Sequence, residues 1–198
     1  MNKQQLAAKI WESANQMRSK IEANEYKDYI LGFIFYKYLS EQEEKWLHSK
    51  GYEAENIQEY VNENAPDAYS GKSNLQQNLG YFISYENLFS TWIRKGVDFS
   101  IDDVSVALSA FNRLISPTHK KVFEGIFQTL EVGLSKLGEN AKMQSKAASD
   151  LIHLIDEIPM NGRQDYDVLG FIYEYLLEKF ASNAGKKAGE FYTPHEVS

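Results

Sequence analysis

The chain contains 198 residues, of which 43% are hydrophobic and 25% are charged, a composition typical of a globular protein rather than a disordered one. Cysteine is absent, which excludes disulfides, thiolate nucleophiles and cysteine-ligated metal sites and favours the cytosol. The net charge of −7 repels phosphate, so nucleic-acid binding by this chain alone is disfavoured. The longest apolar run, Tyr29–Leu39, is far shorter than a membrane span, and the start of the chain lacks the pattern of a secretory signal.

The first quarter of the chain has the apolar spacing of helices. An amphipathic helix is predicted from Leu6 to Ile21, because its apolar residues follow a period of about 3.6. Over Glu25–Leu47 apolar and aromatic residues cover almost the whole circumference, which predicts a central core helix. The acidic residues near its end are interpreted as a solvated face rather than as acid/base pairs: Glu41, Glu43 and Glu44. A shorter helix is predicted over Ala54–Asn64.

The middle of the chain alternates turn signals with short apolar segments. Pro66–Asn74 has the composition of an exposed loop. Leu79–Ile83 fits either a lone strand or an extended segment, so a small two-stranded accessory element stays open. Helices are predicted at Glu86–Lys95 and at Ser100–Ile115, where Ser100 and Asp103 have the spacing of a capping pair.

The last part of the chain returns to helical patterns. Phe123–Leu130 is a short apolar segment, and Glu131–Asn140, with two glycines, is interpreted as a connector. Helices are predicted over Ala141–Ile158, ended by a proline, and over Asp167–Phe180, with Asp167 as its cap. The fold class predicted is mostly α, a helical bundle.

The usual catalytic constellations are missing. The four histidines are scattered and show no metal-ligand spacing, so a zinc hydrolase is disfavoured. No two glycines form Gly-x-Gly, which excludes a dinucleotide or phosphate loop. His153 is interpreted as a histidine at the edge of the core, and the basic stretch His119–Lys146 as a solvated face.

The C-terminal segment carries the strongest local signal. Gly185 and Gly189 bracket a short basic loop. Thr193, Pro194 and Glu196 then form a capping box with proline at the first helical position. Two residues follow, so the sequence begins a helix that it does not contain, and we expect a truncated domain.

Three blocks of sequence resemble one protein family. Gly189–Pro194 resembles the segment that opens the methyltransferase domain in the modification (M) subunit of type I restriction-modification systems. These are DNA adenine-N6 methyltransferases that use S-adenosyl-L-methionine. Asp167–Leu177, followed by Phe180–Ala181, resembles the helix before that segment, and Trp11–Arg18 and Tyr26–Ser40 resemble its N-terminal helices. The similarity spans nearly the whole chain, although the middle matches mainly in spacing.

The resemblance implies a domain organisation and a cofactor segment. Residues 1–184 would form the helical N-terminal domain, and residues 185–198 the linker and first residues of an α/β methyltransferase domain. The cofactor-binding segment implied by the family comprises Glu190, Phe191, Tyr192, Thr193, Pro194 and His195. A helix N-terminus suits the carboxylate of S-adenosyl-L-methionine, and aromatic faces suit its sulfonium. The alternative is that Phe191 and Tyr192 anchor the linker against the bundle.

The resemblance also implies a function. The family's Asn-Pro-Pro-aromatic catalytic motif is missing, since the four prolines are never adjacent; no catalytic residue or metal ligand is assigned, and this chain alone is expected to be inactive. The complete cytoplasmic protein would methylate adenine in double-stranded DNA together with a specificity subunit and a restriction subunit, and this helical part would help to hold DNA and the partner subunits. The alternatives are the front end of a single-chain adenine methylase and a stand-alone helical interaction module without a cofactor.

Overall fold

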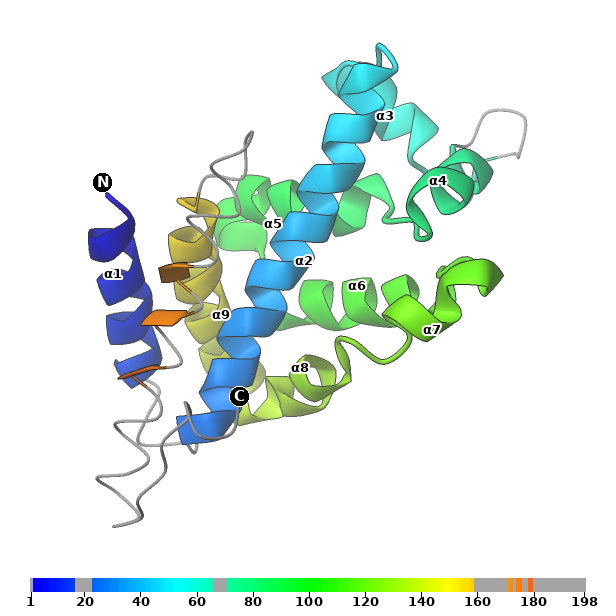
Figure 1. Cartoon of the computed structure of the whole chain (residues 1–198). Helices are drawn as coiled ribbons and strands as arrows, with labels where there is room; N and C mark the ends of the chain where they lie inside the picture. The colour runs from blue at the N-terminus through cyan, green and yellow to red at the C-terminus, as the bar shows by residue number, and fades with distance from the viewer. Residues whose placement is uncertain are drawn as a thin grey trace. The chain divides into compact units, whose positions relative to one another are not determined.

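The computed structural model describes residues 2–16, 23–65 and 71–158, together with residues 171–172, 174–175 and 178–179. The chain divides into two compact units. Unit 1 comprises Met1–Ile34 and Ser135–Ser198, and unit 2 comprises Phe35–Leu134. Every regular element within the described residues is a helix (Figure 1), which confirms the predicted mostly-α class. None of the helices in these ranges is long and apolar enough to cross a membrane.

Unit 1 is built around a pair of packed helices. α1 (Lys3–Gln16) and α9 (Ala141–Asp156) lie side by side (Figure 1). The buried side chains of the pair recur at helical spacing: Leu6, Ala7 and Ile10 on α1, and Ala148, Leu151, Ile152 and Ile155 on α9. The side chain of Asn140 accepts a hydrogen bond from the backbone N–H of Met143 at 2.9 Å, which caps the start of α9.

The prediction that His153 lies at the core edge is wrong. This side chain is exposed, and its Nδ1 lies 2.8 Å from the carbonyl oxygen of Ser149, one turn earlier. The buried face of α9 passes through Leu151, Ile152 and Ile155. A step of 100° per residue turns position 153 away from that face.

The longest helix is α2, which spans Ala23–Ser49 and confirms the predicted core helix. It begins in unit 1 and continues in unit 2. Its buried side chains include four in unit 1, Tyr29, Ile30, Phe33 and Ile34, and six in unit 2, Tyr36, Lys37, Leu39, Ser40, Glu43 and Leu47. The unit 2 part therefore buries polar as well as apolar side chains.

Unit 2 surrounds its part of α2 with short helices. They are α3 (Ala54–Tyr60), α4 (Lys72–Leu79), α5 (Phe89–Lys95), α6 (Ile101–Arg113), α7 (Lys120–Phe123) and α8 (Gln128–Gly133). Short 3₁₀ turns lie at Tyr85–Asn87, Gly96–Asp98, Pro117–His119 and Leu134–Leu137. Aromatic rings fill the core: the ring of Tyr36 stacks on Trp92 at 4.8 Å between centroids, and Phe111 meets Phe127 edge-on at 5.1 Å.

Local capping signals are confirmed in unit 2. α6 begins after Ser100, and the predicted capping box is formed. The Ser100 backbone N–H donates to Oδ2 of Asp103 at 2.9 Å. These hydrogen bonds join residues three apart, so they depend only on the local sequence.

Two predicted loops are shorter than expected. Of Pro66–Asn74, residues 66–70 lie outside the described part, and Lys72–Asn74 already belong to α4. Gly71 before them is buried, and a Cβ there would clash with the Tyr60 ring. The prediction of a connector over Glu131–Asn140 is wrong up to Leu137, where the chain is helical. The buried residues Leu130, Gly133, Leu134 and Leu137 have the i, i+3, i+4, i+7 spacing of one helix face.

The remaining expectations concern the segment after α4 and the C-terminal helix. Leu79 ends α4, and residues 81–84 have no helix or strand, so of the two alternatives, a lone strand and an extended segment, the lone strand is wrong. Residues 171–172, 174–175 and 178–179 are helical, in agreement with the predicted helix, whereas its cap Asp167 lies outside the described residues. The lysines of the basic stretch, Lys120, Lys121, Lys136, Lys142 and Lys146, are all exposed as predicted.

Candidate functional site

The predicted cofactor segment is not among the residues that the structure describes. Glu190, Phe191, Tyr192, Thr193, Pro194 and His195 all lie outside them, as does the predicted boundary at 184/185. The assignment therefore stays a prediction from the sequence. In the described part of the chain, no group of three or more His, Asp and Glu side chains is placed to hold a metal ion.

A buried carboxylic acid on α2 was missed by the sequence analysis. Glu43 has no exposed surface, so the interpretation of Glu41–Glu44 as a solvated face is wrong at this position. Its Oε1 accepts a hydrogen bond from the backbone N–H of Ile83 at 2.8 Å, and its Oε2 has no hydrogen-bond partner among the described residues. The available signal was the four-residue spacing from Leu39 and to Leu47, which puts Glu43 on the same face of the helix.

The environment of Glu43 favours its neutral form. Burial raises the pKa of this carboxyl well above its ordinary value; the Ile83 N–H lowers it in part, and the neighbouring Glu44 raises it again. A neutral acid at this position holds a proton without needing a counter-ion.

The same face of α2 caps the start of α5. The residue before α5, Leu88, provides no side-chain cap. Instead the Ser40 hydroxyl accepts from the backbone N–H of Phe89 at 3.2 Å, and the Glu44 carboxylate accepts from the Ser90 hydroxyl at 3.0 Å. Burial also raises the pKa of Glu44, opposed by the bond from Ser90. The start of α5 is therefore stabilised by a helix more than 40 residues earlier in the chain.

Two buried tyrosines, Tyr36 and Tyr81, lie near Ser40, Glu43 and Glu44, and together these five residues form a polar cluster. The Tyr36 hydroxyl donates to the carbonyl of Asn87, and the Tyr81 hydroxyl donates to the carbonyl of Leu39, both at 2.7 Å. Burial, followed by the nearby Glu43, raises the pKa of both phenols well above the ordinary value. Both therefore act as neutral hydrogen-bond donors. The cluster holds the irregular segment after α4 against α2 and contains no activated nucleophile.

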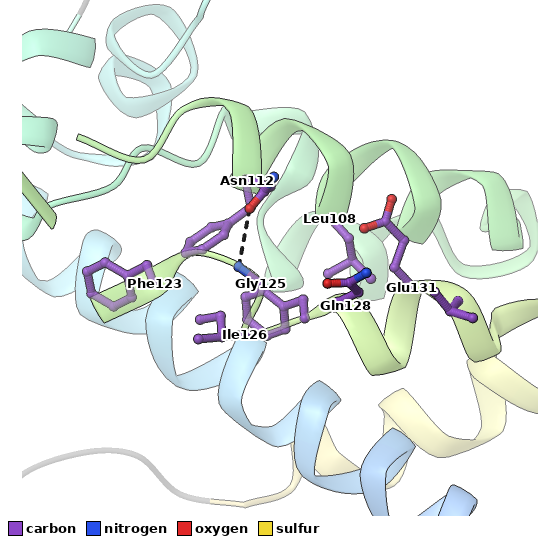
Figure 2. Close-up of a pocket in the computed structure, with 10 residues that line it drawn as sticks. Leu108, Asn112, Phe123, Gly125, Ile126, Gln128 and Glu131 are labelled. Carbon is purple, nitrogen blue, oxygen red and sulfur yellow. Dashed lines mark hydrogen bonds between the residues drawn. The ribbon is translucent and has the colours of Figure 1, made fainter. Parts of the chain in front are cut away.

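A pocket of about 350 Å³ lies among α6, α7 and α8 of unit 2 (Figure 2). Its lining comprises Leu108, Phe111, Asn112, Phe123, Gly125, Ile126, Phe127, Gln128, Glu131 and Val132. Phe111 and Phe127 are buried, whereas Asn112 and Glu131 are exposed. The turn between α7 and α8 is tied to α6, because the N–H of Gly125 donates to Oδ1 of Asn112 at 3.4 Å. The lining has one charged group and no hydroxyl, amine or imidazole, so it is suited to binding rather than to nucleophilic catalysis.

A second, more polar pocket of about 220 Å³ lies elsewhere in unit 2, beside α3 and α6. Its lining includes the ion pair between Arg113 and Glu63, whose two hydrogen bonds measure 2.9 and 3.1 Å. Glu63 raises the pKa of Arg113 further. Arg113 is exposed and Glu63 is half-buried, and the pair joins α6 to the segment after α3, which is a structural role.

Two family models match nearly the whole length of the chain. Residues 6–158 match the family described as HsdM N-terminal domain, and residues 164–198 match N-6 DNA Methylase. The chain is 28% identical over 204 residues to the type I restriction enzyme MpnII methylase subunit of Mycoplasma pneumoniae, covering 96% of this chain and 37% of that protein. It is 24% identical to the type I restriction enzyme MjaIX methylase subunit of Methanocaldococcus jannaschii, covering 96% of this chain and 33% of that protein.

A solved structure agrees with these matches. The type I restriction-modification system methyltransferase subunit from Streptococcus thermophilus superposes with a TM-score of 0.72 at 27% identity, over 98% of this chain and 42% of that one. The chain spans about a third of the length of the curated relatives it matches. The family resemblance seen in the sequence is confirmed. The chain belongs to the HsdM N-terminal domain family and is homologous to the N-terminal region of type I restriction enzyme methylase subunits.

Proposed function

We propose that this chain is the N-terminal region of a subunit that transfers a methyl group from S-adenosyl-L-methionine to the N6 amino group of adenine in double-stranded DNA. The observation that carries the proposal is the pair of adjoining family matches, an HsdM N-terminal domain followed by an N-6 DNA Methylase match that runs to residue 198. The complete protein acts in the cytoplasm with a specificity subunit and a restriction subunit. The helical region helps to hold DNA and to assemble the subunits.

We assign residues 1–184 to the helical N-terminal domain and residues 185–198 to the linker and the start of the catalytic domain. Glu190–His195 are the residues of this chain that would hold S-adenosyl-L-methionine, which supplies the methyl group when bound. The chemistry supports this: the capping-box pattern at Thr193 and Glu196 predicts a helix start, and the first backbone N–H groups of a helix suit a carboxylate. Phe191 and Tyr192 offer aromatic faces to a sulfonium.

The test uses the full-length protein and the double variant Tyr192→Ala/Thr193→Ala. We expect the affinity for S-adenosyl-L-methionine to fall by about tenfold or more, which corresponds to about 1.4 kcal/mol, as measured by calorimetric titration. Thermal unfolding of the helical domain should stay nearly unchanged. Tyr175→Ala/Thr129→Ala, which removes the same side chains outside the segment, is the matched control. Unchanged cofactor affinity in the Tyr192/Thr193 variant would show that the segment is a structural linker.

Activity provides the second test. The full-length protein with its specificity subunit should incorporate labelled methyl groups into adenine of duplex DNA. The 198-residue chain alone should incorporate none even with excess S-adenosyl-L-methionine, because it has no Asn-Pro-Pro motif. Methyl transfer by this chain alone would contradict the proposal that the catalytic motif is not among these 198 residues.

A further inference from the structure

The stretch of chain after α4 is held to α2 by polar contacts rather than by regular structure. Residues 81–84, here called the connecting segment, form neither helix nor strand, yet the first three of their side chains are buried. The Tyr81 hydroxyl donates to the carbonyl of Leu39 at 2.7 Å, and the Ile83 N–H donates to Oε1 of Glu43 at 2.8 Å. The Glu43 carboxyl is therefore one of the contacts that keep this segment against the helix.

The connecting segment is anchored at both ends to other parts of unit 2. Before it, the carbonyl of Gly80 accepts a hydrogen bond from the backbone N–H of Ser116 at 2.9 Å. After it, the backbone N–H of Tyr85 donates to the carbonyl of Val61 at 2.8 Å. Both anchors join backbone groups, which do not titrate, so a change of charge on α2 leaves them in place. The connecting segment can therefore move between two fixed points.

Two phenols, a second acid and an apolar ring surround Glu43. Tyr36 and Glu44 lie on α2 with it, and Tyr81 comes from the connecting segment. From α6, the ring of Phe111 lies 6.4 Å from that of Tyr36 and 5.5 Å from that of Tyr81, between centroids. Burial raises the pKa of both phenols well above the usual value, which keeps them neutral. Of Tyr81 and Glu43, which bond the connecting segment to α2, Glu43 is therefore the one that changes charge.

The cations near this cluster are engaged with other acids. Lys37, buried on α2, forms an ion pair with Glu41 at 3.0 Å, and Arg94 on α5 acts on the carboxyl of Glu44. Neither cation is among the groups that shift the pKa of Glu43. The Oε2 atom of Glu43 has no hydrogen-bond partner among the described residues. An ionised Glu43 would thus bury a charge that a single backbone N–H compensates, and it would gain stability from contact with water.

Water reaches this carboxyl at the lowest cost through a movement of the connecting segment. α2 is a helix of 27 residues, and its own backbone hydrogen bonds keep it rigid. The connecting segment has no helix or strand of its own. Segments with few backbone hydrogen bonds open locally at a lower free energy than the helices around them.

We propose that the connecting segment is a flap controlled by the proton of Glu43. With Glu43 neutral, the flap lies closed on α2. With Glu43 ionised, the flap parts from α2 and admits water to the carboxylate, while the anchors at Gly80 and Tyr85 hold its ends. This conformational change goes beyond the proposed function and is independent of it.

The experiment measures amide hydrogen exchange of the full-length protein between about pH 5 and pH 9, by mass spectrometry with resolution to single residues. The readout is the protection factor, which is the exchange rate of an unstructured amide at the same pH divided by the observed rate. In the wild type, the protection of the Ile83 N–H should fall by up to about tenfold for each pH unit, because opening releases one proton from Glu43. The fall should level off above the pKa that Glu43 has in the closed state.

Two variants test whether Glu43 is the group that controls the flap. Glu43→Gln does not titrate and keeps an oxygen that can accept from the Ile83 N–H, so the protection of this amide should stay within about twofold over the same range. Glu44→Gln is the matched control on the neighbouring residue. It should retain the fall, and the fall should level off at a lower pH, because Glu44 raises the pKa of Glu43. An equal fall in wild type and Glu43→Gln would overturn the proposal.

The same measurement in dilute urea separates local opening from global unfolding and requires no variant. In the wild type, the protection of Ile83 should be lower than that of Leu108, which is buried on α6. Urea should leave Ile83 nearly unchanged and lower the protection of Leu108, since local opening exposes little surface. Equal protection and equal urea dependence at the two amides would overturn the flap, because Glu43 would then meet water only when the whole fold is lost. A protection of Ile83 that does not change with pH would overturn it as well.

Discussion

Glu43 lies in an acidic run of the sequence that predicts a solvated side chain, but its carboxyl is buried. It is fully buried, bonded through one oxygen to Ile83, and surrounded by Glu44, Tyr36 and Tyr81. No lysine or arginine appears among the groups that shift its pKa. The acid is thus stabilised by protonation, because in the low dielectric of a core an unpaired carboxylate is costly.

This environment predicts a pH-dependent stability. Because the folded-state pKa of Glu43 is raised, the folded state binds a proton more tightly than the unfolded one. Its contribution is therefore fully present below the unfolded pKa of about 4.3 and is lost as the pH rises from there through the folded-state pKa. Glu43→Gln removes this titration while keeping an oxygen that can accept from the Ile83 N–H. The free energy of unfolding of the wild type should fall relative to that of Glu43→Gln as the pH is raised from 5 towards 9.

Urea unfolding of both proteins across this range provides the measurement, and the difference between them removes the contributions of histidines and surface acids. Glu43→Ala, which leaves the Ile83 N–H without its acceptor, should cost about 1–3 kcal/mol at pH 5. This cost should shrink as the pH rises, because only the wild type loses stability through the titration of Glu43. Parallel pH profiles for wild type and Glu43→Gln would show that the buried acid is not the titrating group.

At the scale of elements, unit 2 stabilises a short helix from outside. α5 contains seven residues, too few to persist alone in water, and its N-terminal groups are bonded to α2 rather than to a cap of its own. In contrast, α6 and α9 are capped by nearby residues, since the hydrogen bonds of Ser100 and Asn140 join residues three positions apart. α5 should therefore depend on α2 for its formation, whereas α6 and α9 begin where their own sequences direct.

The Ser40 hydroxyl is predicted to stabilise the start of α5. Ser40→Ala removes the acceptor for the Phe89 N–H and should cost about 1 kcal/mol of unfolding free energy, with faster amide exchange at Phe89 and Ser90. Ser49→Ala is the control on the same helix. Ser49 is exposed and donates only to the carbonyl of Trp46, so its loss should cost less than about 0.5 kcal/mol. Equal effects of the two substitutions, on stability and on exchange, would refute the cap from α2.

On the scale of the whole molecule, the charge distribution predicts a low affinity of the isolated chain for DNA. The net charge is −7, and the lysines of the basic stretch lie exposed among acidic residues such as Glu124, Glu131 and Glu139. The proposed role in holding DNA would therefore require positive charge from outside the described residues.

The isolated chain should accordingly bind duplex DNA only in the nonspecific range, with a Kd of about 10⁻⁴ to 10⁻⁶ M or weaker at physiological salt. A fluorescence anisotropy titration at several salt concentrations measures this directly. Submicromolar binding that weakens steeply with salt would reveal a basic face that the described residues do not show.

The family, the helical class and the cap at Ser100 were predicted from the sequence alone. The cap at Asn140 was not predicted, although its sequence signal, an asparagine directly before a helical pattern, is present. Helical periodicity and caps involve residues three or four positions apart, and the family blocks are contiguous runs. The cofactor segment at Glu190–His195 belongs to the same kind of inference and stays a prediction.

Only the tertiary structure decided the burial of Glu43, the irregular segment at residues 81–84 and the pocket among α6, α7 and α8. Glu43 contacts its partner Ile83 at a separation of 40 residues. The four-residue spacing from Leu39 and to Leu47 indicates the face of α2 on which Glu43 lies, but it does not show which distant segment covers that face. A short helix such as α7 contains too few residues to show a period. Burial and concavity depend on which distant segments pack together, and a local pattern does not carry that information.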